Sequence, residues 1–373
     1  MFIIFGTPRS GTTLLASTLN LNDQVIIPDE TDFIVPAAII LERVKDPVAG
    51  KNIILDLIVS TERFKYSIGK YLSKEDIHNA IQDREYSLPN IISAIYHKIA
   101  EKSGKSIAGD KSPNDLTYMT PLLRAGLFNG DIKIIHLIRD VRGAVLSFGN
   151  TYWTHPGDET AFIRSWNNSN LRLHNLMRNN TEYYLLIKYE DMITSPPETL
   201  NKMTDFLGVP FQDKMLDHDR RALNYNIDEH QKNIKLPFIK EKIIEWKKEL
   251  SADLRDICEK EAHAALKTFG YMVNKKRKST GNIATTKEKS LMKSMHNKDK
   301  KIIILQGKIK ELESWGKKLD IDIAQKDKRL TELQKEVEEL GSWGKSLDKE
   351  IAEKDRKIIE LQQKPGKPKT IVK

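Results

Sequence analysis

The first fifteen residues constrain the fold of this chain more than any other stretch. A short apolar run, Phe2 to Phe5, leads into a glycine-containing loop and then into a predicted helix that starts at Thr12. The loop reads Gly6-Thr7-Pro8-Arg9-Ser10-Gly11. Two glycines five positions apart let successive backbone N–H groups face one concavity, and the helix start adds its positive end. The pattern of strand, loop and helix predicts a phosphate-binding loop.

This loop differs from the loop of nucleoside triphosphatases. In that class a lysine follows the second glycine and reaches the terminal phosphates. Here Thr12 takes that position, and Arg9, inside the loop, is the only cation. The predicted concavity is therefore kept without the lysine that handles triphosphates. The alternative reading is an ordinary turn between a strand and a helix, with Arg9 exposed.

A second motif begins about 130 residues later. An apolar strand ends at Ile138 and is followed by Arg139-Asp140-Val141-Arg142, with Ser147 eight residues after the first arginine. An arginine at a strand end can bind a phosphate through two N–H groups, and a serine two turns along the next helix can add a hydroxyl donor. The alternative is an arginine that pairs with Asp140 or with Asp110.

Apolar runs that read as strands alternate with helical patterns along the first 270 residues. The runs lie at 24–27, 106–109, 132–138 and 183–189, and residues 33–104 form a helical block. Such alternation predicts an α/β fold, a P-loop-like three-layer sandwich in which helices flank a parallel sheet. Ligands of such sheets bind at the carboxyl ends of the strands. We expect five side chains to meet there: Arg9, Glu30, Lys111, Arg139 and Tyr189.

Together the two motifs resemble those of sulfotransferases that use 3′-phosphoadenosine 5′-phosphosulfate (PAPS), most of all bacterial members similar to the tyrosylprotein type. The resemblance covers about residues 1–272. It implies that Arg139 and Ser147 bind the 3′-phosphate and that Tyr189 borders the nucleotide. It also implies that the 5′-phosphosulfate is bound by Gly6, Thr7, Pro8, Arg9, Ser10, Gly11, Thr12 and Thr13.

The same resemblance implies the catalytic residues. Glu30, in Asp29-Glu30-Thr31, takes the position of the general base, and Lys111 and Arg9 supply positive charge to the sulfuryl and leaving-group oxygens. Small-molecule sulfotransferases instead have a histidine shortly after a lysine, and none follows Lys111. Without the family, Glu30 reads as an exposed acid near a helix start, Lys111 as a surface lysine in a turn, and Tyr189 as a core residue.

Other candidate residues carry weaker patterns. Lys235 is a loosely spaced candidate for a late contact to the 3′-phosphate, with a surface lysine as the alternative. His136 and His155 have no partner in the sequence and are predicted to be structural. Sulfuryl transfer depends on positioning and electrostatics, and no cluster of His, Cys or Asp has ligand spacing. We therefore predict no metal.

Charge and cysteine content suggest a cellular setting. Residues 1–273 carry a net charge of −2 and residues 274–373 one of +11, which together give the chain its +9. The basicity thus belongs to the tail, which could meet acidic polymers or membrane head groups. One cysteine, Cys258, allows no internal disulfide, no leader pattern opens the chain, and no apolar run is long enough to span a bilayer. We expect a soluble, cytoplasmic protein.

The tail contains a 28-residue repeat, in which residues 307–334 align with 335–362. With Ile302 at heptad position a, fourteen of eighteen a and d positions are apolar, mostly branched at a and leucine at d, as in parallel dimeric coiled coils. We predict a basic linker over 274–298, a coiled coil over 299–362 that self-associates or docks on a partner coil, and a disordered basic tail over 363–373. The alternative is a solvated single helix.

These observations predict a sulfotransferase domain over residues 1–273. It would move a sulfuryl group from PAPS to a hydroxyl of a carbohydrate or of a protein tyrosine. One alternative is a P-loop kinase or another NTP-binding enzyme. Another is a coiled-coil scaffold with an inactive nucleotide-binding head. Nucleic acid is not an expected partner.

Overall fold

The computed structural model describes residues 1–129, 132–151, 154–155, 157–221, 234, 236–272, 325, 328, 332, 335, 341–343 and 345–359. The chain separates into two compact units, Met1–Gly281 and Asn282–Lys373. In the second unit, residues 341–343 and 345–359 are helical. The first unit contains the sheet and both predicted motifs.

The first unit is built on five parallel strands in the order β2-β3-β1-β4-β5. The strands are β1 (Phe2–Phe5), β2 (Val25–Ile26), β3 (Ile107–Lys111), β4 (Lys133–Ile138) and β5 (Tyr184–Lys188). Most of their residues are buried, which is typical of strands covered on both faces. The predicted parallel sheet is confirmed.

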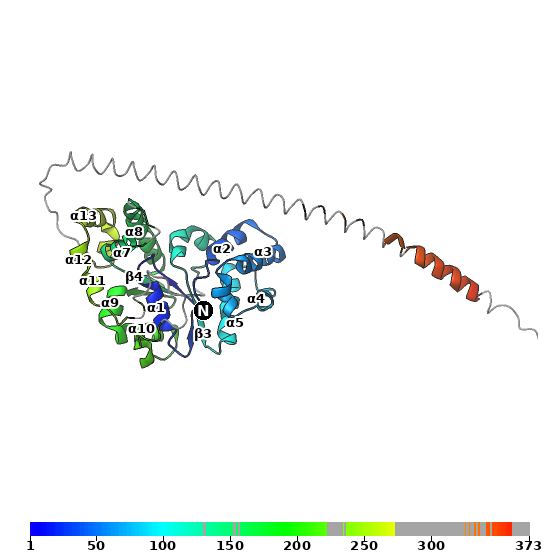
Figure 1. The fold of residues 1–373 in the computed structure, drawn as a ribbon, viewed down its shortest axis with the longest axis horizontal. Helices are drawn as coiled ribbons and strands as arrows, with labels where there is room; N and C mark the ends of the chain where they lie inside the picture. The colour runs from blue at the N-terminus through cyan, green and yellow to red at the C-terminus, as the bar shows by residue number, and fades with distance from the viewer. Residues whose placement is uncertain are drawn as a thin grey trace, which may run out of the picture. The chain divides into compact units, whose positions relative to one another are not determined.

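Helices cover both faces of the sheet (Figure 1). Side chains of β1 alternate between them, so Ile3 and Phe5 pack into one core cluster while Phe2 and Ile4 pack into the other. The first cluster includes residues of α2 (Ile34–Arg43), α3 (Pro47–Ser60), α4 (Lys74–Ile81), α5 (Leu88–Lys102), α6 (Met119–Arg124) and α8 (Asp158–Met177). The second includes residues of α1 (Thr12–Leu19), α9 (Tyr189–Thr194) and α10 (Pro196–Leu207). The three-layer sandwich is therefore confirmed.

A third core cluster forms where α7 (Val141–Gly149) and α8 meet the last helices of the unit. Those are α13 (Ala252–Glu261) and α14 (His263–Thr268); α11 (Glu241–Ile244) and α12 (Trp246–Glu249) precede them. Four short 3-10 helices complete the described elements: η1 (Phe64–Tyr66), η2 (Ile68–Lys70), η3 (Pro113–Tyr118) and η4 (Asp213–Leu216). In this cluster, the start of α7, which carries the second motif, packs against α13 and α14.

Several helix boundaries follow local signals in the sequence. Ser73 and Asp76 form a capping box at the start of α4. Gly208, at the end of α10, has the left-handed conformation that a helix end favours. Two predicted strand ends differ in the structure: β3 extends to Lys111, and Tyr189 opens α9 instead of ending β5. Lys111 therefore belongs to the sheet and not to a turn.

Candidate active site

The five predicted residues lie at or after the carboxyl ends of the five strands, with Lys111 as the last residue of β3. Because the strands are parallel and their order is β2-β3-β1-β4-β5, the residues are arrayed along one edge in the same order. That order is Glu30, Lys111, Arg9, Arg139 and Tyr189. The five residues therefore gather at this edge, as expected. They form two clusters, one around Arg9 and Arg139 and one around Glu30 and Lys111.

The arginine cluster consists of Arg9, Arg139, Ser147 and Tyr189. The Nε of Arg9 donates a hydrogen bond to the Oγ of Ser147 at 3.1 Å, across 138 positions of sequence. Arg139 donates from Nη1 to the backbone oxygen of Arg9 at 3.1 Å, and its guanidinium lies 4.5 Å from the ring centroid of Tyr189. Both predicted motifs therefore meet at one place.

The loop that carries Arg9 depends on a residue without a side chain. Gly11 has a φ of +94°, and a Cβ there would lie 2.6 Å from the ring of Tyr189. Arg9 itself has a φ of +68°, a conformation that few residues other than glycine adopt. Unusual backbone conformations of this kind gather at binding sites. Thr7 and Ser10 brace the loop through a 2.8 Å hydrogen bond between their hydroxyls.

Positive charge is concentrated in this cluster. Burial lowers the pKa of Arg9, and repulsion from the guanidinium of Arg139 lowers it further. Arg139 is buried, and it packs over Gly143, where a Cβ would lie 3.2 Å from its Nε. Two guanidiniums that repel each other beside a glycine-rich loop form a site that favours a bound anion.

The two arginines of the Arg-Asp-x-Arg motif have different partners. Arg142 forms a 2.7 Å ion pair with Asp140 and a 3.2 Å ion pair with Glu259, and it stacks 4.0 Å over the ring of Trp246. Asp140 also caps α7 by accepting a hydrogen bond from the backbone N–H of Arg142. Asp140 therefore pairs with Arg142, which leaves Arg139 directed toward the phosphate loop.

The glutamate cluster consists of Glu30, Asp32, Arg63 and Lys111. Glu30 is held at both carboxylate oxygens, by Lys111 Nζ at 2.7 Å and by Arg63 Nη1 at 3.0 Å. Arg63 also contacts Asp32, with Nε 3.1 Å from Oδ2. Burial acts to raise the pKa of Glu30, but Lys111 and Arg63 outweigh it, so the pKa lies below its ordinary value. Glu30 is thus a carboxylate at neutral pH.

Buried hydrogen bonds support the segment that carries Glu30. Thr31 donates from its hydroxyl to Asp110 Oδ1 at 2.8 Å, and the hydroxyl of Tyr96 donates to the same oxygen. All three side chains are buried, and Asp110 comes directly before Lys111 in β3. The strand that positions the lysine therefore also anchors the backbone next to the glutamate.

Sequence reasoning missed Arg63 and Tyr96. Arg63 lies 33 positions from Glu30, between α3 and η1, and no motif marks it. Tyr96 is a buried residue of α5 whose spacing reads only as core. Lys235, the predicted late contact, lies outside the described residues.

His136 has a structural role in the core. His136 is fully buried and forms hydrogen bonds with Tyr184 at 2.7 Å and Asn170 at 2.8 Å. Burial lowers its pKa to about 4. His155 is exposed. In the described part of the chain, no group of three or more His, Cys, Asp or Glu could hold a metal ion, and no helix is long and apolar enough to cross a membrane.

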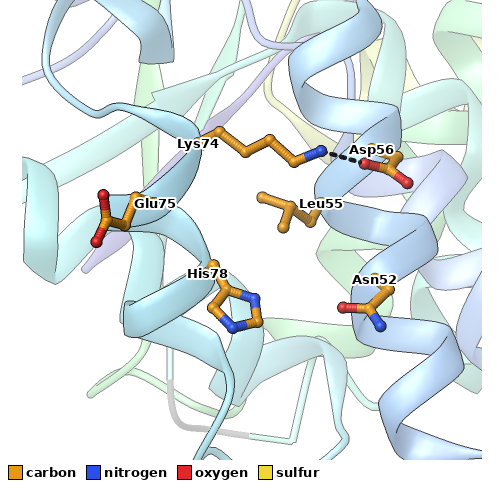
Figure 2. A pocket seen from close by; sticks show the side chains of 6 residues that line it. All are labelled: Asn52, Leu55, Asp56, Lys74, Glu75 and His78. Carbon is orange, nitrogen blue, oxygen red and sulfur yellow. Dashed lines mark hydrogen bonds and ion pairs between the residues drawn. The ribbon is translucent and has the colours of Figure 1, made fainter. Parts of the chain in front are cut away.

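An open pocket of about 590 Å³ lies elsewhere, between α3 and α4 (Figure 2). It is lined by Asn52, Leu55, Asp56, Lys74, Glu75 and His78. Asp56 and Lys74 form a 2.8 Å ion pair there, and both are exposed. None of the predicted site residues lines this pocket. Its polar side chains are exposed, so it shows no buried polar group that would select a ligand.

The chain is similar in sequence and fold to known sulfotransferases. Residues 2–213 match the model of a sulfotransferase family. The sulfotransferase domain of the Synechococcus PCC 7002 olefin synthase is similar in fold, with a TM-score of 0.50 and 22% identity over 74% of this chain and 95% of that one. The sulfotransferase domain of the curacin biosynthetic pathway gives a TM-score of 0.47 and 19% identity over 74% and 98%. The matched residues include the phosphate loop, Glu30, Lys111 and the second motif, and the chain belongs to the sulfotransferase family and is a sulfotransferase enzyme.

Proposed function

We propose that the enzyme uses PAPS and transfers its sulfuryl group to a hydroxyl of a carbohydrate or of a protein tyrosine. The observation that carries the proposal is the meeting of Arg9, Arg139 and Ser147 at the glycine loop. When PAPS is bound, it supplies an activated sulfuryl group on a phosphate leaving group. A site with two neighbouring guanidiniums suits a nucleotide that carries phosphates on both its 5′ and 3′ sides.

The arginine cluster would hold the nucleotide. The loop N–H groups from Gly6 to Thr13 and the side chain of Arg9 would bind the 5′ side, and Arg139 with Ser147 would bind the 3′-phosphate. Tyr189 would border the nucleotide beneath Arg139. The ring of Tyr189 packs closely against Gly11 and would help to fix the position of the loop. This assignment follows the tyrosylprotein type, a subtype that is itself part of the proposal.

The glutamate cluster would perform the transfer. Glu30 would accept the proton of the acceptor hydroxyl while the acceptor oxygen bonds to sulfur and the bond between sulfur and the phosphate oxygen breaks. Lys111 and Arg9 would stabilise the negative charge on the sulfuryl and departing phosphate oxygens. A positioned general base of this kind contributes about 10²- to 10⁴-fold to the rate. The ion pairs that lower the pKa of Glu30 keep it ionised and ready to accept the proton.

Calorimetric titration of the full chain tests the nucleotide assignment. The probes are 3′-phosphoadenosine 5′-phosphate (PAP), ADP, and ATP with magnesium. Because charge-assisted hydrogen bonds from Arg139 and Ser147 would be made only to a 3′-phosphate, PAP should bind about tenfold to hundredfold more tightly than ADP. Tighter binding of ATP with magnesium would favour the P-loop kinase, and no nucleotide binding would favour the scaffold with an inactive head.

We also propose that the tail assembles the enzyme as a homo-oligomer through residues 299–362. In the described helix of the second unit, Leu347 lies at heptad position d, and Ile351 and Ile358 lie at position a. Their side chains are 43%, 50% and 51% exposed. Lys354 lies at a further heptad position between them. Most of the predicted coiled coil, the linker and the final tail lie outside the described residues. Light scattering of the full chain and of a truncation after residue 273 should show an oligomer and a monomer. Both proteins scattering as monomers would refute the assembly.

A cytoplasmic location remains a prediction. Cys258 is free and buried in the third core cluster. Burial raises the pKa of its thiol to about 12, so the reactive thiolate is suppressed. A single protected thiol is compatible with a reducing compartment. Fluorescence microscopy of a tagged full chain in its own cell would test it.

A further inference from the structure

The residues of the glutamate cluster differ widely in their exposure to solvent. Lys111, on the inner side of Glu30, has a side chain that is 1% exposed, and Glu30 itself is 15% exposed. On the outer side, Asp32 is 38% and Arg63 is 52% exposed. Asp32 and Arg63 are therefore the solvent-exposed residues of the cluster, and Arg63 contacts Glu30 directly. These two residues form the entrance to the proposed base.

The entrance offers a matched pair of polar groups. The Arg63 Nε lies 3.1 Å from Asp32 Oδ2, while Nη1 of the same guanidinium reaches Glu30. Asp32 has a φ of +53°, a left-handed conformation that places its carboxylate beside this arginine at a local backbone cost. A carboxylate accepts hydrogen bonds from hydroxyls, and a guanidinium donates to their oxygens. The pair is suited to neighbouring hydroxyl groups, each of which is both donor and acceptor.

The charge around the entrance is unfavourable for an anion. Burial raises the pKa of Asp32, and the neighbouring carboxylates of Glu30 and Asp29 raise it further. Lys111 and Arg63, the cations that contact Glu30, are already paired with it. A further carboxylate brought in by the acceptor would meet repulsion from the carboxylates of Asp29, Glu30 and Asp32, and like charges placed together reduce affinity strongly.

We propose that the acceptor is a neutral or amino-bearing carbohydrate, in which the hydroxyls next to the reacting one bind Asp32 and Arg63. This inference rests on the proposed function and narrows its acceptor class. It disfavours the other open class, tyrosine peptides with acidic flanks, because they would place carboxylates against the entrance. Asp32 and Arg63 would then act as specificity-determining residues, whereas Glu30 and Lys111 would act on the reacting atoms.

Matched acceptors test the charge preference. The full chain is incubated with radiolabelled PAPS and one of five probes at equal concentration. The probes are tetramers of N-acetylglucosamine, glucosamine and galacturonic acid, and two tyrosine nonapeptides flanked by alanine or by aspartate. We expect the neutral and amino sugars to exceed the uronic acid tetramer and the acidic peptide by about tenfold or more in kcat/KM. Equal or higher turnover of the uronic acid or acidic peptide would overturn the inference, as would sulfation of no sugar.

Substitution of Asp32 tests the entrance directly. Asparagine keeps the shape of the side chain and tolerates a positive φ, so Asp32→Asn should fold normally. We expect KM for the favoured sugar to rise about tenfold, while kcat and the KM for PAPS change little, since a hydrogen bond to a charged group is lost. The preference against the uronic acid tetramer should shrink as well. A fall in kcat with unchanged sugar KM would contradict a role in acceptor binding.

A matched control and a separate binding assay keep the outcomes distinct. Asp56→Asn removes an exposed carboxylate from the pocket of Figure 2, where Asp56 pairs with Lys74 at 2.8 Å, and it should leave every constant unchanged. A protein that binds no PAP would refute the proposed function itself. A protein that binds PAP and sulfates the acidic peptide best would refute only the carbohydrate inference.

Discussion

The arginine cluster and the glutamate cluster occupy neighbouring parts of one sheet edge but are held in place differently. Around Arg9 and Arg139 the geometry depends on backbone shape: a left-handed Gly11 against Tyr189, and Gly143 beneath Arg139. Around Glu30 the geometry depends on ion pairs, with a cation on each carboxylate oxygen. Backbone packing tolerates little change, whereas the exposed pair of Arg63 and Asp32 beside Glu30 adapts to a ligand at small cost. We infer that the first cluster suits an invariant nucleotide and the second an acceptor.

Glu30→Gln should have the largest effect of the substitutions, and it should affect sulfuryl transfer without affecting nucleotide binding. The amide cannot take a proton from the acceptor, so transfer should fall about 10²- to 10⁴-fold. PAP binding should stay unchanged because the arginine cluster is intact. Radiolabel transfer and calorimetry on the same protein measure both. Loss of PAP binding would mean that the clusters are not independent, and undiminished transfer would refute Glu30 as the base.

Alanine substitutions of the two arginines of the second motif should affect different properties, namely stability for Arg142 and PAP binding for Arg139. Arg142→Ala leaves the carboxylates of Asp140 and Glu259 without their cation, which should cost about 3–5 kcal/mol of unfolding free energy. Arg139→Ala should keep most of the stability and weaken PAP binding about tenfold or more. Urea unfolding and calorimetry of both variants give the comparison. Similar profiles for the two would contradict the division between ligand binding and structure.

Gly11→Ala tests the backbone geometry of the arginine cluster. The methyl group would meet the ring of Tyr189 at 2.6 Å in a left-handed conformation, so we expect a loss of about 1–3 kcal/mol in stability and weaker PAP binding. Gly208→Ala is the matched control, because it has a φ of +79° and nothing within 4 Å of a Cβ. The control should lose some stability and keep its PAP affinity. A parallel loss of affinity in the control would show that strain alone is responsible.

The ion pairs of Glu30 should make a small, pH-dependent contribution to stability. Its pKa is lowered in the folded state by Lys111 and Arg63 against the opposing effect of burial. The contribution is therefore complete above the ordinary pKa of a glutamate and is lost as the pH falls through the lower folded value. The difference in unfolding free energy between wild type and Glu30→Gln should shrink between neutral pH and pH 3. A difference that stays constant in urea titrations would contradict the ion pairing.

Local patterns explain how much could be predicted from the sequence. The alternation of strands and helices, the glycine spacing and the Arg-Asp-x-Arg motif each lie within a few residues, so the sheet and the arginine cluster were predictable. Glu30 and Lys111 were placed through a resemblance, because alone they read as surface charges. Arg63 was not predictable, since its contact with Glu30 depends on how the end of α3 packs 33 positions away. The more distant partners of Arg142, which are Glu259 and Trp246, likewise emerged only from the packing of α13 and α12.

The inclusion of Lys111 in β3 has a consequence for how the enzyme would lose activity. Its backbone is paired in register with Ile4 of β1, in the interior of the sheet. Interior strands open to solvent only when most of the domain unfolds, whereas loop segments open locally and often. Amide hydrogen exchange at Lys111 should thus be as slow as at the most protected core positions. Heat should inactivate the enzyme only near the temperature at which the sheet itself melts.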